Sequence, residues 1–177
     1  MITGLWGTPV GERFSFDGAH YQLTDSPALP KPHQRPGPPV IVGGGGKRRT
    51  PALAARFASE FNLAFSSLAD TGEQFGRVRQ ACRAAGRQED SMVLSAAQVI
   101  CCGEDEATIT RRAGAIGREV AELRVNGLCG TPAEAVAKLA SYADVGVQRM
   151  YLQVLDLADL DHLALIAEAV LPYCAAL

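Results

Sequence analysis

VIVGGGGKRRTP, residues 40–51, places four glycines between a short apolar run and a segment with helical periodicity. An apolar run that ends in glycines and leads into a helix is typical of a strand–turn–helix unit. Strands that lack strict polar alternation are usually covered on both faces, as in parallel α/β sheets. The stretch therefore predicts an α/β fold.

The same alternation continues towards the C-terminus. Apolar runs at 63–65, 92–101 and 150–154 predict three further strands. Helices are predicted from about residue 51, over 71–85, from 131 to about 146, and over 158–174. The prediction is thus four short parallel strands with flanking helices, which make either a small open sheet or half of a barrel.

Apolar spacing describes three of the helices more closely. One long helix is predicted by the spacing i, i+4, i+7, i+11 and i+14 of Ile109, Ala113, Ile116, Val120 and Leu123. Thr131-Pro132-Ala133-Glu134 is a capping box that begins the next helix. In the last helix we expect the core-facing stripe to be Leu160, Leu163, Ala167 and Leu171.

The first part of the chain has a different character. Residues 1–6 look like the end of an amphipathic helix, and residues 7–38 are rich in proline and glycine. Inside this segment, apolar residues alternate around Asp17-Gly18, a pair that favours a two-residue hairpin turn. We therefore expect two regions: 1–38, the end of a helix plus an insertion or lid segment with a hairpin, and 39–177, the strand–helix units.

Composition excludes several classes of partner. The formal net charge of −2 argues against a nucleic-acid or anionic-membrane surface. No apolar window reaches the roughly 18 residues of a membrane helix, and the N-terminus has no signal-peptide pattern. The five cysteines have no CxxC spacing, so we expect reduced thiols in the cytoplasm, with neither a disulfide framework nor a metal site.

The glycine run is the candidate ligand site. Glycines let a backbone approach a ligand closely, and the start of the following helix favours an anion. We predict that Thr50 caps that helix and that Lys47, Arg48 and Arg49 add positive charge for a phosphate. The alternative is a tight turn with solvated basic residues. Gly130-Thr131-Pro132 offers a similar cap, for which a plain helix cap is the preferred interpretation.

Two familiar phosphate motifs do not fit this run. A Walker A loop that ends at Lys47 would need glycine at Ile41 and Ser or Thr at Arg48. A GxGxxG motif that starts at Gly43 would need glycine at Arg48. Neither a P-loop NTPase nor a standard dinucleotide-binding fold is supported.

Several segments resemble a known family. SFDGAHYQL (15–23), ALPKP (28–32) and PPVIVGGGGKRRTPALAARFASEFN (38–62) resemble the middle of luciferase-like monooxygenases, and more narrowly the actinobacterial F420-dependent oxidoreductases of that superfamily. NGLCGTPAEAVAKL (126–139) and VQRMYLQVLDLADLDHLALIAEAVLP (147–172) are similar to the C-terminus of the same group. The resemblance covers essentially the whole chain.

The resemblance implies the C-terminal half of a (β/α)8 TIM barrel. Residues 40–42 would be strand 5, residues 150–154 strand 8, and residues 7–38 the insertion after strand 4. It assigns cofactor binding to Gly43, Gly44, Gly45, Gly46, Arg49 and Thr50. Because barrel active sites lie at the C-terminal ends of the strands, the cofactor mouth would also include Ser66, Ser67, Cys101, Cys102 and residues 153–156.

The resemblance further implies a flavin- or deazaflavin-dependent oxidoreductase that transfers hydride or oxygen to a small organic substrate. Coenzyme F420 is the expected cofactor, with FMN as the alternative. Strands 1–4, which supply most acid–base groups in relatives, are missing, so the catalytic residues stay unknown. His20 is interpreted as a surface residue, and Asp156, Asp159 and Asp161 as caps of the last helix.

A second hypothesis competes with the enzyme. The chain would be a non-catalytic half-barrel, either a fragment or an assembly module. Four strands cut from a barrel leave open edges and an uncovered inner face. We therefore expect a homodimer or a larger assembly.

Overall fold

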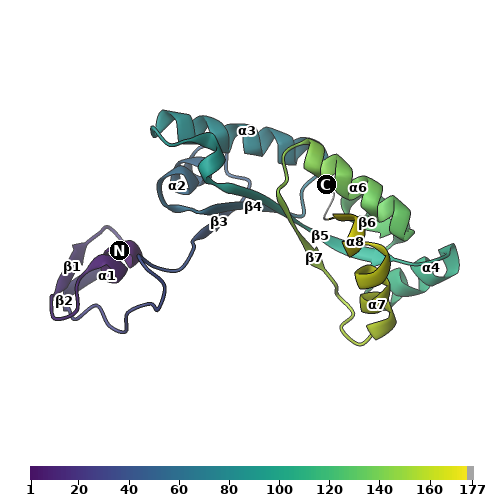
Figure 1. Cartoon of the computed structure of the whole chain (residues 1–177), viewed down its shortest axis with the longest axis horizontal. Coiled ribbons are helices and arrows are strands. Elements are labelled where there is room, and N and C mark those ends of the chain that lie inside the picture. Colours follow the sequence, from purple (N-terminus) through teal and green to yellow (C-terminus); the bar gives the residue numbers. More distant parts are fainter. Residues whose placement is uncertain (175–177) are drawn as a thin grey trace. The chain divides into compact units, whose positions relative to one another are not determined.

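The computed structural model describes residues 1–174, and of Glu89 only the backbone. The chain divides into two compact units, Met1–Val40 and a larger unit that begins at Ile41. Each unit has its own secondary structure (Figure 1).

The first unit contains a short helix and a hairpin. Helix α1 spans Ile2–Gly7, and strands β1 (Phe14–Asp17) and β2 (Gln22–Ser26) pair antiparallel. Asp17 pairs with Gln22, and the Gly18 N–H donates to the Tyr21 carbonyl at 3.0 Å. The predicted two-residue Asp17-Gly18 turn is therefore wrong, because Asp17 still belongs to the strand and residues 18–21 form the loop.

The second unit is built on parallel strands, which confirms the predicted α/β class. Its strands are β3 (Ile41–Gly43), β4 (Glu60–Ala64), β5 (Val93–Cys102), β6 (Leu128–Gly130) and β7 (Arg149–Gln153). Strand β4 lies between β3 and β5, whereas β7 and β6 pair with the middle and the C-terminal end of β5. The four predicted strands are present; three-residue β6 is too short to have been recognised from its apolar run.

The helices of this unit follow the strands in alternation, and their bounds are α2 (Arg49–Phe57), α3 (Leu68–Ala84), α4 (Glu106–Ala115), α5 (Val120–Asn126), α6 (Pro132–Asp144), α7 (Leu160–Ala169) and α8 (Leu171–Cys174), with a 3-10 turn at Glu89–Ser91. The predicted long helix is two helices, because Gly117 adopts a φ of 67° between them. Ile109 of α4 and Leu123 of α5 nevertheless lie in one buried cluster, so the predicted apolar face continues from one helix to the next.

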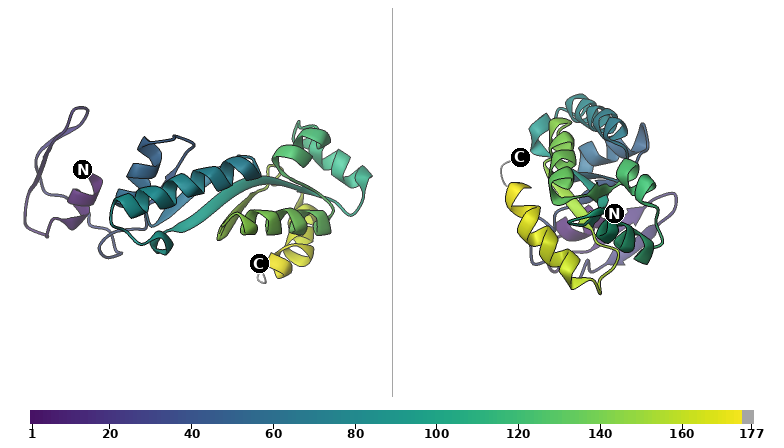
Figure 2. Two further views of the ribbon diagram at one scale, coloured as in Figure 1. Left: turned by 90° about the horizontal axis from the view of Figure 1, so that it is seen from above. Right: turned by 90° about the vertical axis from the view of Figure 1, so that its right-hand side faces the viewer.

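Helices α2 and α3 cover one face of the β3–β4 part of the sheet (Figure 1). Phe75 of α3 is buried in one cluster with Phe61 of β4 and Leu94 of β5, between these helices and the sheet. Helices α6 and α7 bury a second cluster around Ile100 and Leu128. Helices α4 and α5 lie at the opposite end of the unit from α2 (Figure 2) and cover Val99 and Cys101 of β5.

The prediction for the last helix is wrong about its buried side. Leu160, Leu163 and Leu171 are 68%, 39% and 49% exposed, whereas His162 and Ile166 are buried. Both stripes have helical spacing, so periodicity alone did not select between them. His162 fits the buried side because its Nε2 accepts a hydrogen bond from the Cys102 N–H at 3.0 Å.

Candidate functional site

The glycine run forms an exposed loop at the C-terminal end of β3. Gly44 adopts a φ of 123°, a conformation that favours glycine, and its N–H donates to the Asn62 carbonyl at 3.3 Å. A Cβ on Gly46 would lie 2.5 Å from the Thr50 Oγ1, whereas one on Gly45 would meet nothing within 4 Å. Gly44 and Gly46 are therefore required by the shape of the loop, and Gly45 faces open space.

A buried glutamine holds this loop in place. Gln74 on α3 is 2% exposed, and its Nε2 donates to the carbonyls of Gly44 (3.2 Å) and Gly46 (3.0 Å). Arg77 in turn donates to the Gln74 Oε1 at 2.9 Å, which fixes the amide with its nitrogen towards the loop. Sequence reasoning missed Gln74, since no local pattern connects it to a loop about 30 residues earlier. Its polarity inside an otherwise apolar stripe was the one available signal.

Helix α2 begins directly after the loop. Its N-cap is Arg48, so the prediction of Thr50 as the cap is wrong: Thr50 lies in the first turn. That turn has no acidic residue, and Lys47, Arg48 and Arg49 are exposed. Among the described residues, no acceptor contacts the N–H groups of Gly45 and Gly46. The loop thus combines open N–H donors, three cations and the positive end of a helix dipole.

The sheet face opposite α2 and α3 carries small and polar side chains near this loop. Gly43, Asn62, Ser95 and Arg149 lie in one row across four strands. The Asn62 Nδ2 donates to the Ser95 Oγ at 2.9 Å. Ala64 and Ala97 follow two residues further along their strands. The result is a sheet face of small side chains next to the glycine loop, in which Asn62 is half-buried and the Ser95 hydroxyl is fully buried.

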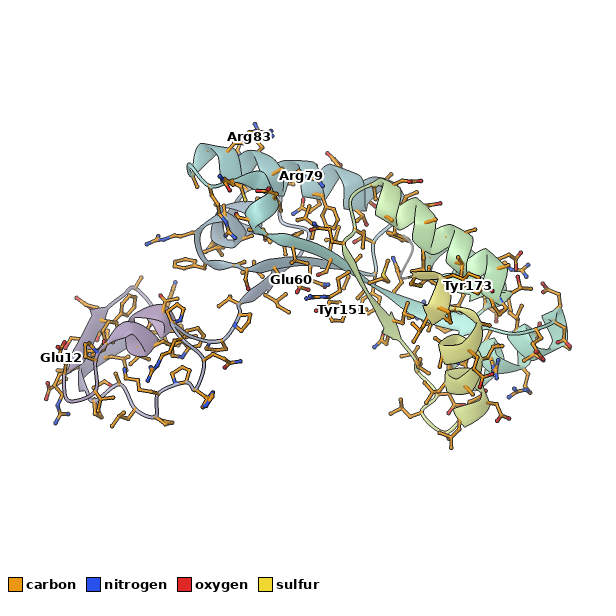
Figure 3. All side chains as sticks on the ribbon, in the orientation of Figure 1. Glu12, Glu60, Arg79, Arg83, Tyr151 and Tyr173 are labelled. Carbon is orange, nitrogen blue, oxygen red and sulfur yellow. The ribbon has the colours of Figure 1, made fainter. Side chains whose placement is uncertain are left out.

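A buried carboxylate lies closer to the N-terminal ends of the same strands. Glu60 is 4% exposed, its Oε1 accepts a hydrogen bond from the Tyr151 hydroxyl at 2.8 Å, and its Oε2 pairs with Arg149. Figure 3 shows Glu60 and Tyr151 approaching each other on this face. The Tyr151 hydroxyl and the Arg149 guanidinium thus both bind the Glu60 carboxylate. Because Glu60 lies on β4 and its two partners lie on β7, these contacts join the two strands across β5.

The residues expected at the mouth after β4 have structural contacts. The Ser66 carbonyl accepts hydrogen bonds from the Gln98 Nε2 (2.7 Å) and the Tyr142 hydroxyl (3.0 Å). Burial raises the pKa of Tyr142, which keeps this hydroxyl protonated. Ser67 caps α3, because its Oγ accepts from the Asp70 N–H at 3.1 Å.

Cys101 and Cys102 do not face the mouth as expected. They are 1% and 0% exposed, because α4 and α5 cover Cys101 and α6 and α7 cover Cys102. Burial raises the pKa of the Cys101 thiol to about 11 and that of Cys102 to about 12. Both thiols are therefore protonated and unreactive at neutral pH.

The residues after β7 form a buried polar cluster. Asp159 caps α7, since its Oδ1 accepts from the His162 N–H at 2.9 Å, and it accepts the Arg112 Nε at 2.9 Å. The Arg112 hydrogen bonds hold the pKa of Asp159 down to about 2, whereas burial lowers the pKa of His162. The predicted cap role is confirmed for Asp159; Asp156 accepts the Ala158 N–H at 3.0 Å and Asp161 lies in the first turn of α7.

The remaining predicted positions lie outside these sites. Thr131 and Glu134 form the predicted capping box of α6, and the Glu134 carboxylate already accepts the Thr131 N–H at 2.7 Å. The plain helix cap is therefore the better interpretation there. His20 is exposed in the hairpin loop of the first unit, as expected of a surface residue.

Known proteins of similar sequence or structure indicate the family of this chain. The family model for luciferase-like monooxygenases matches residues 1–126. No curated protein sequence matches the chain. Three solved structures share its fold: an F420-dependent secondary alcohol dehydrogenase with an F420–acetone adduct, the coenzyme F420-dependent tetrahydromethanopterin reductase from Methanopyrus kandleri, and a riboflavin lyase with modified FMN and riboflavin.

The likeness is strong in shape and weak in sequence. The TM-scores are 0.79, 0.74 and 0.70, at identities of 13%, 17% and 14%. These matches cover 96%, 97% and 98% of this chain but 58%, 60% and 55% of the others, so the chain spans less than two thirds of their length. Its parallel strands and helices are part of a (β/α)8 barrel, as predicted. Because the family model matches most of its length, the chain belongs to the luciferase-like monooxygenase family.

Proposed function

We propose that the chain is the cofactor-phosphate half of a flavin- or deazaflavin-dependent oxidoreductase, with coenzyme F420 as its cofactor and FMN as the alternative. The observation that carries this proposal is the exposed glycine loop, followed directly by the N-terminus of α2 and three cations. FMN and F420 both bear a phosphate on a chain attached to their ring system. We assign the phosphate to Gly43, Gly44, Gly45, Gly46, Arg49 and Thr50.

The residues present fit such a group. The N–H groups of Gly45 and Gly46 are open, and arginine binds phosphate in a bidentate way. Gln74 occupies the carbonyls of Gly44 and Gly46, so these oxygens are kept from facing an anion. The small side chains of Ala64 and Ala97 leave room for a flat ring on the adjacent sheet face.

The cofactor, when bound, supplies hydride transfer or oxygen chemistry. The chain's own part is to bind and orient it: Arg49 and the loop bind the anion, and Gln74 with Arg77 keeps the loop in shape. The first unit, Met1–Val40, is proposed as the insertion or lid segment of the barrel. The substrate is a small organic molecule, and no residue of this chain is assigned as catalytic.

A second candidate function is a non-catalytic half-barrel that serves as an assembly module. The observation in its favour is the series of exposed apolar side chains after β7, which begins with Leu155, Leu157 and Leu160. In either case we propose a homodimer or larger assembly, because Ile41 and Tyr151 on the open sheet face are 52% and 40% exposed.

The cysteines bear on where the protein works. None of the five cysteines, all within the described residues, forms a disulfide, and four of them are buried. Cysteines without disulfides are typical of a reducing compartment. We therefore propose a cytoplasmic location. Separately, no helix among residues 1–174 has the length and apolar character needed to cross a membrane.

Titration of the chain with FMN and with F420, followed by cofactor fluorescence and calorimetry, tests the cofactor proposal. We expect saturable binding that Arg49→Gln weakens about 10- to 100-fold, because a hydrogen bond to a charged group contributes roughly 1.5–3 kcal/mol. Arg56→Gln is the matched control, since Arg56 lies in the last turn of the same helix over the Phe57 ring.

The outcome decides between the two functions. Absence of binding of both cofactors would remove the enzyme proposal for this chain and favour the assembly module. Equal weakening by Arg49→Gln and Arg56→Gln would keep the cofactor but remove the phosphate from the glycine loop.

A further inference from the structure

Two strand edges of the second unit are open. Among the described residues, β3 pairs with β4 alone and β7 pairs with β5 alone. Each edge strand offers unpaired backbone groups to another strand. Because all strands of this sheet are parallel, β7 and β3 have the polarity that one parallel ladder between them requires.

Apolar side chains accompany both edges. Ile41 of β3 and Leu53 and Phe57 of α2 are 52%, 47% and 40% exposed. The segment after β7 exposes a longer series, namely Leu155, Leu157, Leu160, Leu163, Leu171 and Tyr173. This series includes most of the stripe that apolar spacing marks as core-facing. Its exposure in a single chain indicates a surface that another chain covers.

The loops at the C-terminal ends of these two strands have opposite charge. After β3 come Lys47 and Arg48, both exposed. After β7 come Asp156 and Asp161, on a surface shared with Arg111. Arg111 is paired with Asp159, its NH2 lying 3.6 Å from that carboxylate. Asp159 is paired with Arg112 as well, which leaves Asp156 and Asp161 to give this loop its negative charge.

We infer that the partner in the proposed assembly is a second copy of this chain, joined by β7 of one copy adding in parallel to β3 of the other. The inference rests on the proposed assembly and names its surface. The C-terminal ends of parallel strands meet at one edge, so the join places Lys47 and Arg48 of one copy beside Asp156 and Asp161 of the other. A two-fold axis repeats the same pairing at a second seam. Strands β3, β4, β5 and β7 of the two copies, eight in all, then form one closed ring.

Charge reversal in two separate chains tests this seam. One variant carries Lys47→Glu and Arg48→Glu, and the other carries Asp156→Lys and Asp161→Lys. Each alone places like charges at both seams, so we expect its dimer dissociation constant in analytical ultracentrifugation to rise roughly tenfold or more. An equimolar mixture restores opposite charges at both seams, and we expect dimers at the wild-type affinity. Glu104→Lys with Glu119→Lys is the matched control for charge and folding, because both residues are exposed on other elements.

Three outcomes separate the possibilities. A wild-type dimer that neither variant weakens, or a mixture that does not recover, would overturn the seam while the assembly proposal stands. A wild-type chain that is monomeric at tens of micromolar would overturn both the seam and the assembly proposal. Circular dichroism of each variant shows that loss of the dimer is not loss of the fold. Cofactor titration of the wild type and of the Asp156→Lys, Asp161→Lys variant, in which the glycine loop and its cations are unchanged, reports separately on the cofactor proposal.

Discussion

The two halves of β5 lie in one strand but in different surroundings. In the C-terminal half, Val99 and Cys101 lie under α4 and α5 and are 7% and 1% exposed. In the N-terminal half, Ala97 lies on the face where Asn62 and Tyr151 project, and no helix among the described residues of the second unit covers this face (Figure 1). Tyr151 is 40% exposed there, although Ser95 of β5 is fully buried. The covered half is buried under helices, whereas the open half carries the surface on which we propose that a cofactor and a partner bind.

The largest effect should come from the buried ion pair at the covered end. Arg112 is 7% exposed and donates to Asp159 and to the Cys102 carbonyl at 2.6 Å. Arg112→Ala leaves the Asp159 carboxylate without this partner, so we expect a loss of about 3–5 kcal/mol in the free energy of unfolding. Urea denaturation measures it. A loss below about 1 kcal/mol would show that the cluster is not important for stability.

Truncation of apolar residues compares the two ends directly. Ile109 is 0% exposed under the covered half, and Ile109→Ala should cost about 2–5 kcal/mol of unfolding free energy because it leaves a cavity. Ile41→Ala on the open face should cost less than about 1 kcal/mol in the monomer. Equal losses in dilute solution, measured by urea denaturation, would contradict the distinction between the two faces.

A smaller, pH-dependent effect belongs to His162. Its pKa in the folded state is lowered by burial and by Arg112, so the unfolded chain takes up a proton more readily as the pH falls below about 6.5. Stability at neutral pH should therefore decline as the pH falls through this range. His162→Gln has no titrating ring, so its urea midpoint should change less between pH 7 and pH 5; an unchanged slope would assign the decline to other groups.

The loss of a single hydrogen bond on the open face should also have a small effect. Tyr151→Phe removes one of the two ligands of the Glu60 carboxylate, the hydroxyl at 2.8 Å, but leaves the ion pair with Arg149. The expected cost is about 0.5–1.5 kcal/mol in thermal or urea unfolding. A loss as large as that of Arg112→Ala would mean that the open face is as rigid as the covered one.

Much of the fold could be predicted from the sequence because its signals are local. The apolar run before Gly43, the capping box at Thr131 and the spacing from Ile109 to Leu123 each indicated a real element. Boundaries were less certain where one residue changes the backbone. Gly117 divides a helix whose apolar spacing continues across it, and Asp17 extends a strand where an Asp-Gly turn was expected.

The candidate site was predicted in part. The glycine loop and the cations beside it are consecutive in the chain, so they were visible as a motif. Gln74 and Glu60 were not, since each acquires its contacts from segments about 30 and 90 residues away. Cys101 and Cys102 showed the reverse error: their position at a strand end suggested a mouth, but α4, α5 and α7 cover them.

The sequence by itself determined the alternation of strands and helices, the glycine loop and the family, because each depends on neighbouring residues. Only the tertiary structure decided which apolar stripe of α7 is buried, which strand ends are covered and which strand edges are open. These depend on packing between distant segments, where two stripes of equal periodicity compete. Within one chain the stripe with His162 and Ile166 is buried, and the stripe from Leu160 to Leu171 stays exposed. This exposed stripe is the surface on which a partner is proposed.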